Sequence, residues 1–399
     1  MKSSPAKRHK DHFFAGFSQN VIVLSLVSFL NDIGGETIKK TIPLFLSNVL
    51  GVPATIIGLV EGVADATPQL FQPISGYISD LFGKRKWLVV FGQLLRFFMV
   101  LLFWATTWPQ VLLVRFLDRS GKGVAQAPRD ALISDSAAKH HIGRAFGLNR
   151  MFDNGGAVVG LVLAGVLVFL TQQRVNLLTA SAFRQIVLFA VIPLIISLFL
   201  LTFFVHDIRA KQKQERLVLH DSLGHKFYLF LFFSFLFMLG NSSDAFLILK
   251  SQSVGVLIWQ IFLLLALYSL VSSLSGLPLS SLSDRIGRKK LLVSGWVVYS
   301  LVYFLFARAS SVTTITLLFL GYGLYFGLTE GAAKALVSDI VPAKRHATAY
   351  GIYNMVTGVT VFAASLFAGF LWQAISPAAP FYLGSATALI AAVGLWVTL

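Results

Sequence analysis

The 399-residue chain contains no cysteine, which excludes disulfide bonds and thiolate metal sites. Histidine is scarce and falls outside the long apolar runs, in the amino-terminal tail or in predicted loops. Its positions are His9, His12, His140, His141, His206, His220, His225 and His346. Soft and borderline metal ions prefer sulfur and imidazole donors, so transport of such ions by side-chain ligation is not expected. We expect neither a metal site nor a cofactor.

Charged residues are also few, at 13% of the chain, whereas 56% of residues are hydrophobic. This balance is typical of an integral membrane protein rather than of a water-soluble domain. About 20 helical residues span the hydrocarbon core, and the apolar runs do not alternate as barrel strands would. We therefore predict an all-α membrane protein with twelve transmembrane helices. Their predicted ranges are 19–47, 55–79, 87–106, 110–134, 145–170, 182–205, 227–249, 254–281, 291–307, 313–337, 348–373 and 380–398.

The net charge of +16 follows a topological pattern. Lysine and arginine concentrate on the side of the predicted bundle that holds the amino terminus, which places that side and both termini in the cytoplasm. Residues 1–16 lack a small-residue cleavage site, so no cleaved signal peptide is expected. We expect a plasma membrane protein, in a bacterium the inner membrane, in contact with anionic lipid. Nucleic-acid binding is not expected, since no soluble domain remains to carry it.

Two segments of the chain, 79–86 and 283–290, are nearly the same and lie 204 residues apart. The same offset relates Asp135 to Asp339 and Met151 to Met355, so that whole halves are repeated. We predict an amino-terminal tail at 1–18, a six-helix bundle at 19–205, a cytoplasmic linker at 206–226 and a second six-helix bundle at 227–399. Parallel repeats of this kind are typical of transporters that bind substrate between their halves.

The repeated segment resembles the loop signature of the major facilitator superfamily of transporters. The first copy carries Gly76, Asp80, Gly83, Lys84 and Arg85, and the second carries Asp284, Gly287 and Arg288. The stretch from Arg115 to Gly123 resembles the fourth-helix motif of that family. The stretches 118–123 and 127–133 are similar to a prokaryotic branch with mostly unassigned substrates.

The resemblance implies the two-bundle fold of the family, alternating access, and a cytoplasmic gate formed by the signature residues. In that gate, Asp80 would bind the neighbouring half and hold the cytoplasmic side closed. The alternative is that the signature residues only fix the membrane topology of the loop. Two positions depart from the pattern. Ser280 replaces the glycine of the second copy, and Leu161 stands where the antiporter signature has proline, which weakens the similarity to drug antiporters.

Charged residues inside the predicted membrane spans concentrate in the first half. Four carboxylates lie on the first two spans, namely Asp32, Glu36, Glu61 and Asp65. Unpaired charges in the membrane are costly, so these groups pair or line water. A carboxylate that loses its basic partner during a conformational change takes up a proton more readily. We predict that these four residues couple protons, with Arg119 and Lys122 as alternating partners of Asp32 and Glu36. A permanent salt-bridge lattice is the alternative.

Polar residues of the fourth span share one helical face, which we predict to line a substrate cavity. They are Arg115, Asp118, Arg119, Lys122, Gln126, Arg129 and Asp130. In the second half we predict cavity roles for Asn241, Asp244, Glu330 and Lys334, although the last two could pair with each other at i,i+4 spacing. Aromatic candidates for the cavity wall are Tyr322, Tyr325, Phe326 and Tyr353.

These features predict a monomeric proton-coupled secondary transporter that moves a small organic anion by alternating access. The basic face of the fourth span favours an anionic solute. A polyspecific drug/proton antiporter is the main alternative, and a lipid flippase is disfavoured by the polar first half. No nucleophile and base can be placed together, so the sequence does not predict an enzyme.

Overall fold

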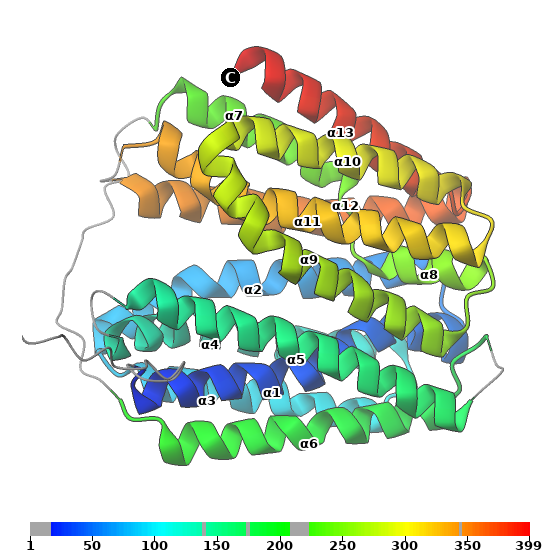
Figure 1. Ribbon diagram of the computed structural model, residues 1–399. Coiled ribbons are helices and arrows are strands. Elements are labelled where there is room, and N and C mark those ends of the chain that lie inside the picture. The colour runs from blue at the N-terminus through cyan, green and yellow to red at the C-terminus, as the bar shows by residue number, and fades with distance from the viewer. Residues whose placement is uncertain (1–16, 138–140, 173–175, 208–222, 343–344) are drawn as a thin grey trace, which may run out of the picture.

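The computed structural model describes residues 17–137, 141–172, 176–207, 223–342 and 345–399. Within these ranges the chain is helical and has no strand. The helices run roughly parallel in two layers, with α1 to α6 below and α7 to α13 above (Figure 1). The predicted all-α membrane fold with twelve spans is confirmed.

The first six spans comprise eight helical segments. These are α1 (Gln19–Leu44) with the π-helical η1 (Phe45–Val49), α2 (Ala54–Phe82), α3 (Arg85–Phe97) with the 3₁₀-helical η2 (Phe98–Trp104), α4 (Trp108–Ser136), α5 (Ile142–Thr171) and α6 (Ala180–Phe204). The last six spans are α7 (His225–Gly240) with α8 (Ala245–Ser253), α9 (Ile258–Ile286), α10 (Arg288–Arg308), α11 (Val312–Ile340), α12 (His346–Ala374) and α13 (Ala379–Thr398).

Apolar composition explains most of these spans. Ten helical stretches of the described chain are long and apolar enough to cross a membrane. The two further long helices are α2 and α4, which carry buried charges in their interiors. By contrast, α6 exposes large apolar side chains such as Ile192, Phe199 and Phe203 on the outside of the bundle, as a lipid-facing helix requires. The polar helices therefore lie inside, where other helices shield their charges.

The seventh span is the one place where the predicted continuous helix is wrong. We expected a single helix over 227–249, but α7 ends at Gly240 and α8 begins at Ala245. The intervening Asn, Ser, Ser and Asp side chains compete with the backbone for hydrogen bonds, which disfavours a helix. The hydroxyl of Tyr299 donates to the freed carbonyl of Gly240 (3.0 Å). Non-helical backbone at this depth is tolerated where it lines a cavity.

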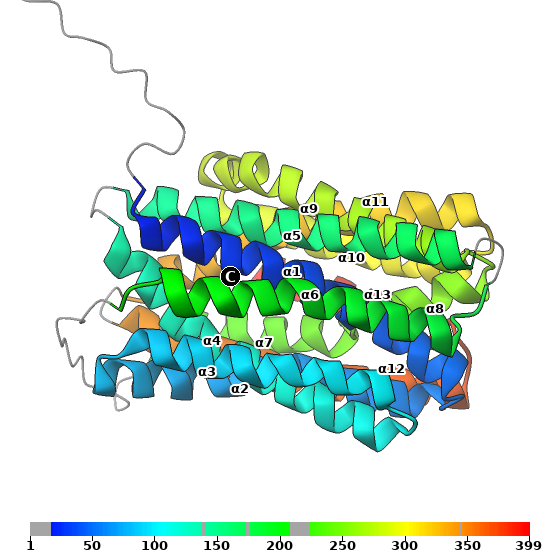
Figure 2. The same cartoon turned by 90° about the horizontal axis from the view of Figure 1, so that it is seen from below.

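Two long helix pairs join the halves: α2 packs along α12, and α5 packs along α9 (Figures 1 and 2). Glycines permit this close contact. A Cβ atom on Gly58 would lie 2.3 Å from the carbonyl oxygen of Ser365, and one on Gly369 would lie 2.5 Å from that of Ala54. Within the first half, Gly156 and Gly160 approach the backbone of α1 just as closely.

We call the end of the bundle that holds Gly83 and Gly287 the signature end, and the other the opposite end. One ion pair between the halves, Arg150–Glu330, lies nearer the signature end, whereas several other side-chain contacts between them lie at the opposite end. The side chains of Asn48 and Gln252 exchange two hydrogen bonds there, of 3.2 and 2.8 Å. The backbone N–H of Ala54 donates to Gln373 (3.3 Å). The two halves are therefore closed against each other at the opposite end.

Candidate substrate cavity

A cavity of about 480 Å³ lies between the halves. Residues from α1, α2 and α4 form one wall, and residues from α7, the break before α8, α11 and α12 form the other. The first wall comprises Lys39, Asp65, Pro68, Gln69, Gln72, Arg119, Lys122 and Gln126. The second comprises Met238, Asn241, Ser242, Ser243, Asp244, Tyr322, Phe326, Lys334, Tyr353, Asn354, Thr357 and Val361. The volume suits a small organic molecule.

The first wall is cationic. Asp65 contacts two basic groups, the ammonium of Lys39 at 3.3 Å and the guanidinium of Arg119 at 3.6 Å. Lys122 also lines the cavity, and among the described residues it forms no ion pair within 4 Å. This wall thus presents three cations against one lining carboxylate.

Two carboxylates of α1 lie close to the cations of this wall without lining the cavity. Asp32 and Glu36 form no ion pair within 4 Å with any described residue. Lys122 and Arg96 are nevertheless near enough to interact electrostatically with Asp32. Glu36 lies among the cations Lys39, Lys40, Lys122 and Arg119. Asp32 and Glu36 are therefore partly buried acidic groups that share the cations of the cavity without being fixed to one of them.

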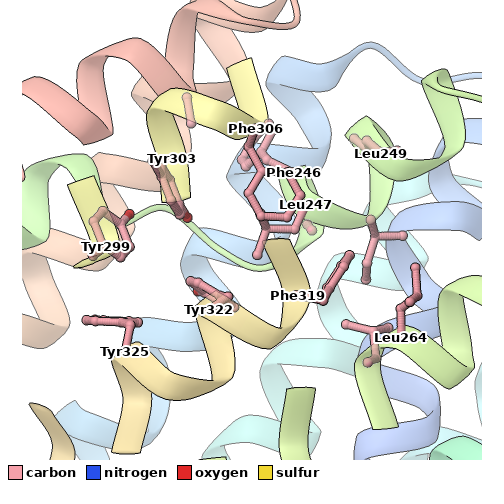
Figure 3. Close-up of a cluster of buried hydrophobic side chains, with 14 of the residues drawn as sticks. Phe246, Leu247, Leu249, Leu264, Tyr299, Tyr303, Phe306, Phe319, Tyr322 and Tyr325 are labelled. Carbon is pink, nitrogen blue, oxygen red and sulfur yellow. The ribbon is translucent and has the colours of Figure 1, made fainter. Parts of the chain in front are cut away.

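The second wall contains aromatic and uncharged polar groups together with two charged residues, Asp244 and Lys334. The hydroxyl of Tyr322 donates to Asp244 (2.8 Å), and the Asn241 amide donates to Tyr325 (3.4 Å). Behind the lining residues, Tyr299 and Tyr303 of α10 point toward Tyr322 and Tyr325 of α11 (Figure 3). The rings of Tyr299 and Tyr303 stack with centroids 4.0 Å apart. This packing holds the second wall rigid.

Lys40 and Asp244 form an ion pair between the halves, and their residue numbers differ by 204, which is the offset of the repeat. Asn48 and Gln252 also differ by 204. Equivalent residues of two repeats can touch only on the approximate two-fold axis that relates them. The two pairs therefore mark that axis, which runs along α1 and the α7–α8 span.

Several charged residues that we expected at the cavity lie inside the first half instead. Arg115 is fully buried, 3.0 Å from Glu61 and 3.7 Å from Asp118. Asp118 also pairs with Arg96 (3.3 Å). None of these four residues lines the cavity. The polar face predicted for the fourth span is thus divided, because α2 and α3 cover its first turns and the cavity exposes the next ones.

Arg129 and Asp130 lie outside the cavity lining too. The Arg129 guanidinium contacts Asp130 (3.2 Å), Asp153 (3.8 Å) and the hydroxyl of Ser28 (2.9 Å). These contacts connect α4 to α1 and α5.

In the second half, Glu330 pairs with Arg150 of α5, and so across the halves. The i,i+4 pairing of Glu330 with Lys334 is therefore not what the structure contains. Lys334 lines the cavity, whereas Glu330 does not.

The signature residues mainly contact their own half. Arg85 pairs with Asp135 at 2.6 Å and with Asp80 at 3.5 Å. Arg288 of the second copy pairs with Asp339, which is the repeat equivalent of Asp135. Each basic residue thus fastens its loop to the end of the fourth helix of the same half.

Glycine is required in both loops, since Gly83 has φ 62° and Gly287 has φ 95°. Gly76 packs against α4, where a Cβ atom added to it would lie 3.4 Å from the Cβ of Ala127. Lys84 precedes α3 as its N-cap. The side chain of Asp284 lies outside the described part of the structure. The Asp80 side chain is 71% exposed, and its binding to the other half stays a prediction.

Sequence reasoning missed the Lys40–Asp244 pair and the amide side chains of Gln69, Gln72 and Asn354 in the cavity. The pair had a signal in the sequence. A lysine and an aspartate occupy equivalent positions of the two repeats, on the first and seventh spans. Gln69 follows Asp65 by four residues on the same face of α2, so it had a weak signal. Gln72 and Asn354 had none, because a single amide side chain inside a helix does not indicate which face meets a cavity.

The chain matches the protein family described as the Major Facilitator Superfamily over residues 24–253 and 227–399. The chain belongs to the major facilitator superfamily. It is 35% identical over 383 residues to an uncharacterized MFS-type transporter of Methanocaldococcus jannaschii, covering 94% of this chain and 93% of that protein. A shorter match, 31% identical over 161 residues and 40% of each chain, is to the multidrug resistance protein MdtH of Aeromonas hydrophila.

Solved structures of the superfamily share the fold. The crystal structure of a single-substitution mutant of the nucleoside transporter NupG aligns with a TM-score of 0.80 at 15% identity, covering 94% of this chain and 98% of that one. A D-xylose-proton symporter aligns with a TM-score of 0.78 at 14% identity, covering 96% and 97%. The protein is therefore an integral membrane transporter of the major facilitator superfamily and not an enzyme.

Proposed function

We propose that this protein is a proton-coupled secondary transporter that moves a small organic anion through the cavity by alternating access. The observation that carries the proposal is the arrangement of Lys122. It lines the cavity without a fixed acidic partner among the described residues, and it interacts electrostatically with Asp32 and Glu36, neither of which lines the cavity. One cation can thus serve either a carboxylate of the protein or an anion in the cavity.

Coupling follows from this competition. When Asp32 and Glu36 are ionised, they attract Lys122 and weaken its hold on an anionic solute. When one of them takes up a proton, Lys122 is released to bind the solute. Proton and anion therefore favour each other's binding. Glu61 has a structural role, because its carboxylate is held 3.0 Å from the fully buried Arg115. Asp65, shared by Lys39 and Arg119, positions the cations of the wall.

The orientation follows from the distribution of basic residues. The signature end carries most of the lysine and arginine and faces the cytoplasm, as do both termini. The halves are closed against each other at the opposite end, and nearer the signature end the exposed Arg150–Glu330 ion pair also joins them. We infer a conformation that faces the cytoplasm. Asp80 then binds the second half only in the other conformation, when the signature end closes. The protein acts as a monomer in a plasma membrane.

The test is transport by purified protein in liposomes with an imposed pH gradient, while internal pH is followed. Organic anions should move protons with them. Asp32→Asn and Glu36→Gln should abolish uphill accumulation but preserve exchange of labelled for unlabelled solute, which needs no net proton transfer. Asp207→Asn, at an exposed carboxylate beyond α6, is the matched control. Unchanged uphill transport in both α1 variants would overturn the coupling proposal.

Proton-driven export of amphipathic compounds is the second candidate. The match to a multidrug resistance protein and the aromatic second wall favour it, whereas the cationic first wall opposes cationic drugs. Including ethidium and neutral dyes in the same assay decides between the two. Proton movement with dyes but not with organic anions would favour export of amphipathic compounds.

A further inference from the structure

The repeat offset relates two cavity residues of opposite chemistry. Lys122 of α4 and Phe326 of α11 differ by 204 in number, and both line the cavity. The approximate axis through the Lys40–Asp244 and Asn48–Gln252 pairs passes between their helices. Residues related by a two-fold axis lie on opposite sides of it. The cavity therefore presents an ammonium group on one wall and an aromatic ring at the equivalent point of the other.

The cationic wall selects a negatively charged group. Lys39 and Arg119 already share the carboxylate of Asp65, whereas Lys122 has no ion pair within 4 Å among the described residues. On the second wall, the charge of Asp244 is taken up by Lys40, which does not line the cavity. An anion entering the cavity thus meets Lys122 with no described carboxylate fixed against it.

The aromatic wall is a fixed surface. Phe326 makes an edge-to-face contact with Tyr322, with centroids 5.3 Å apart, and lies 5.0 Å from the Tyr325 ring and 5.4 Å from the Tyr268 ring. Tyr353, also in the lining, stacks on Phe230 at 5.6 Å. Three neighbours restrict the Phe326 ring, and it can bind a planar ring without losing conformational freedom.

From these walls we infer that the solute is an aromatic carboxylate, with its carboxylate at Lys122 and its ring against Phe326. This inference names the substrate class for the cavity of the proposed function and rests on that function. Lys122 and Phe326 are its specificity-determining residues. A solute with only one of the two groups uses only one wall, and it binds less tightly.

Binding of three matched compounds to the full chain in nanodiscs, by titration calorimetry at fixed pH, tests the inference. The compounds are 3-phenylpropanoate, 3-phenylpropanamide without the charge, and 3-cyclohexylpropanoate without the aromatic ring. The acid should bind about tenfold more tightly than the amide, as expected for one charge-assisted hydrogen bond. It should bind roughly fivefold more tightly than the cyclohexyl compound, as expected for one aromatic contact.

Two variants assign each preference to its wall. Lys122→Gln should remove the preference for acid over amide and keep the preference for the ring, and Lys122→Arg should retain both. Phe326→Leu should remove the preference for the aromatic ring and keep the preference for acid over amide. Lys289→Gln at the signature end and Phe304→Leu on the outer face of α10 are matched controls and should change neither ratio. A split of this kind cannot arise from misfolding, which would weaken all three compounds together.

Equal binding of the phenyl and cyclohexyl acids, or no binding of any of the three, would overturn the inference. The result is separable from the proposed function, because this measurement involves no proton gradient. Proton movement with a non-aromatic anion, without any ring preference, would support the proposed function and contradict the inferred substrate class. Aromatic acid binding without proton movement would support the inferred substrate class and contradict proton coupling.

Discussion

Arg115 and Phe319 occupy the same position in the two halves, 204 residues apart, and neither side chain is exposed to solvent. The first half surrounds its arginine with Glu61 and Asp118. The second half packs its phenylalanine against Phe306, edge to face at 5.7 Å. One helix arrangement thus holds either a charge network or an aromatic core. The halves share a scaffold, and their chemistry is divided between them.

The largest expected effect comes from breaking the charge network. Arg115→Met leaves Glu61 without its partner in a buried site, which costs about 3–5 kcal/mol of unfolding free energy. Phe319→Leu at the equivalent position removes only part of a ring and should cost about 1 kcal/mol. Thermal denaturation in detergent measures both. Adding Glu61→Gln to Arg115→Met should restore part of the loss. Equal destabilisation by the two single variants would show that the charge network of the first half and the aromatic core of the second contribute equally to the unfolding free energy.

A smaller effect is expected from the ion pair on the axis. Lys40→Met leaves Asp244 with the Tyr322 hydroxyl alone, at a penalty of about 2–5 kcal/mol in the closed state. The opposite end should therefore open more often. Because the chain has no cysteine, Ser242→Cys in the cavity provides a single labelling site.

An impermeant maleimide added from the opposite end should label this cysteine faster in the Lys40→Met background. Adding Asp244→Asn removes the stranded charge, so labelling should slow again. A labelling rate that Lys40→Met leaves unchanged would show that the pair does not hold the opposite end closed.

The smallest expected effect concerns the exposed signature residue. Asp80→Asn should slow transport while leaving the solute Kd unchanged, since Asp80 lies outside the cavity lining and pairs with Arg85 in this conformation. Transport rates in liposomes and binding in nanodiscs separate the two quantities. An altered Kd with an unaltered rate would contradict a gating role. The same substitution can also be compared with Asp135→Asn, which removes the shorter ion pair of Arg85 and leaves its pair with Asp80.

Ten of the twelve spans could be predicted from bilayer thickness and apolar runs, and the other two, α2 and α4, from the repeat and the family resemblance as well. The interruption at residues 241–244 was missed, because the apolar residues on either side of it outweighed the local signal of four consecutive polar side chains. The shared face of the fourth span was visible in the sequence. Its division between the interior of the first half and the cavity was not, because it depends on where α2 and α3 cover α4.

Partners across the halves were the hardest to predict. Glu330 has a lysine four residues away, and local spacing favours that pairing, yet Arg150 of α5 is its partner. Such a contact depends on how the halves meet, and no local pattern encodes it. Lys40 with Asp244 is different, because the repeat itself places both residues at one position of the axis.

That ion pair has a consequence for how the two halves can combine. On a two-fold axis each residue meets its own equivalent, so two copies of the first half would bring Lys40 against another Lys40. At about 4 Å such a like-charge contact costs on the order of 4 kcal/mol near a protein surface. Two copies of the second half would oppose two aspartates in the same way. The charges at this point make each half a poor partner for itself and a good one for the other, so a single chain carrying both is the favoured assembly.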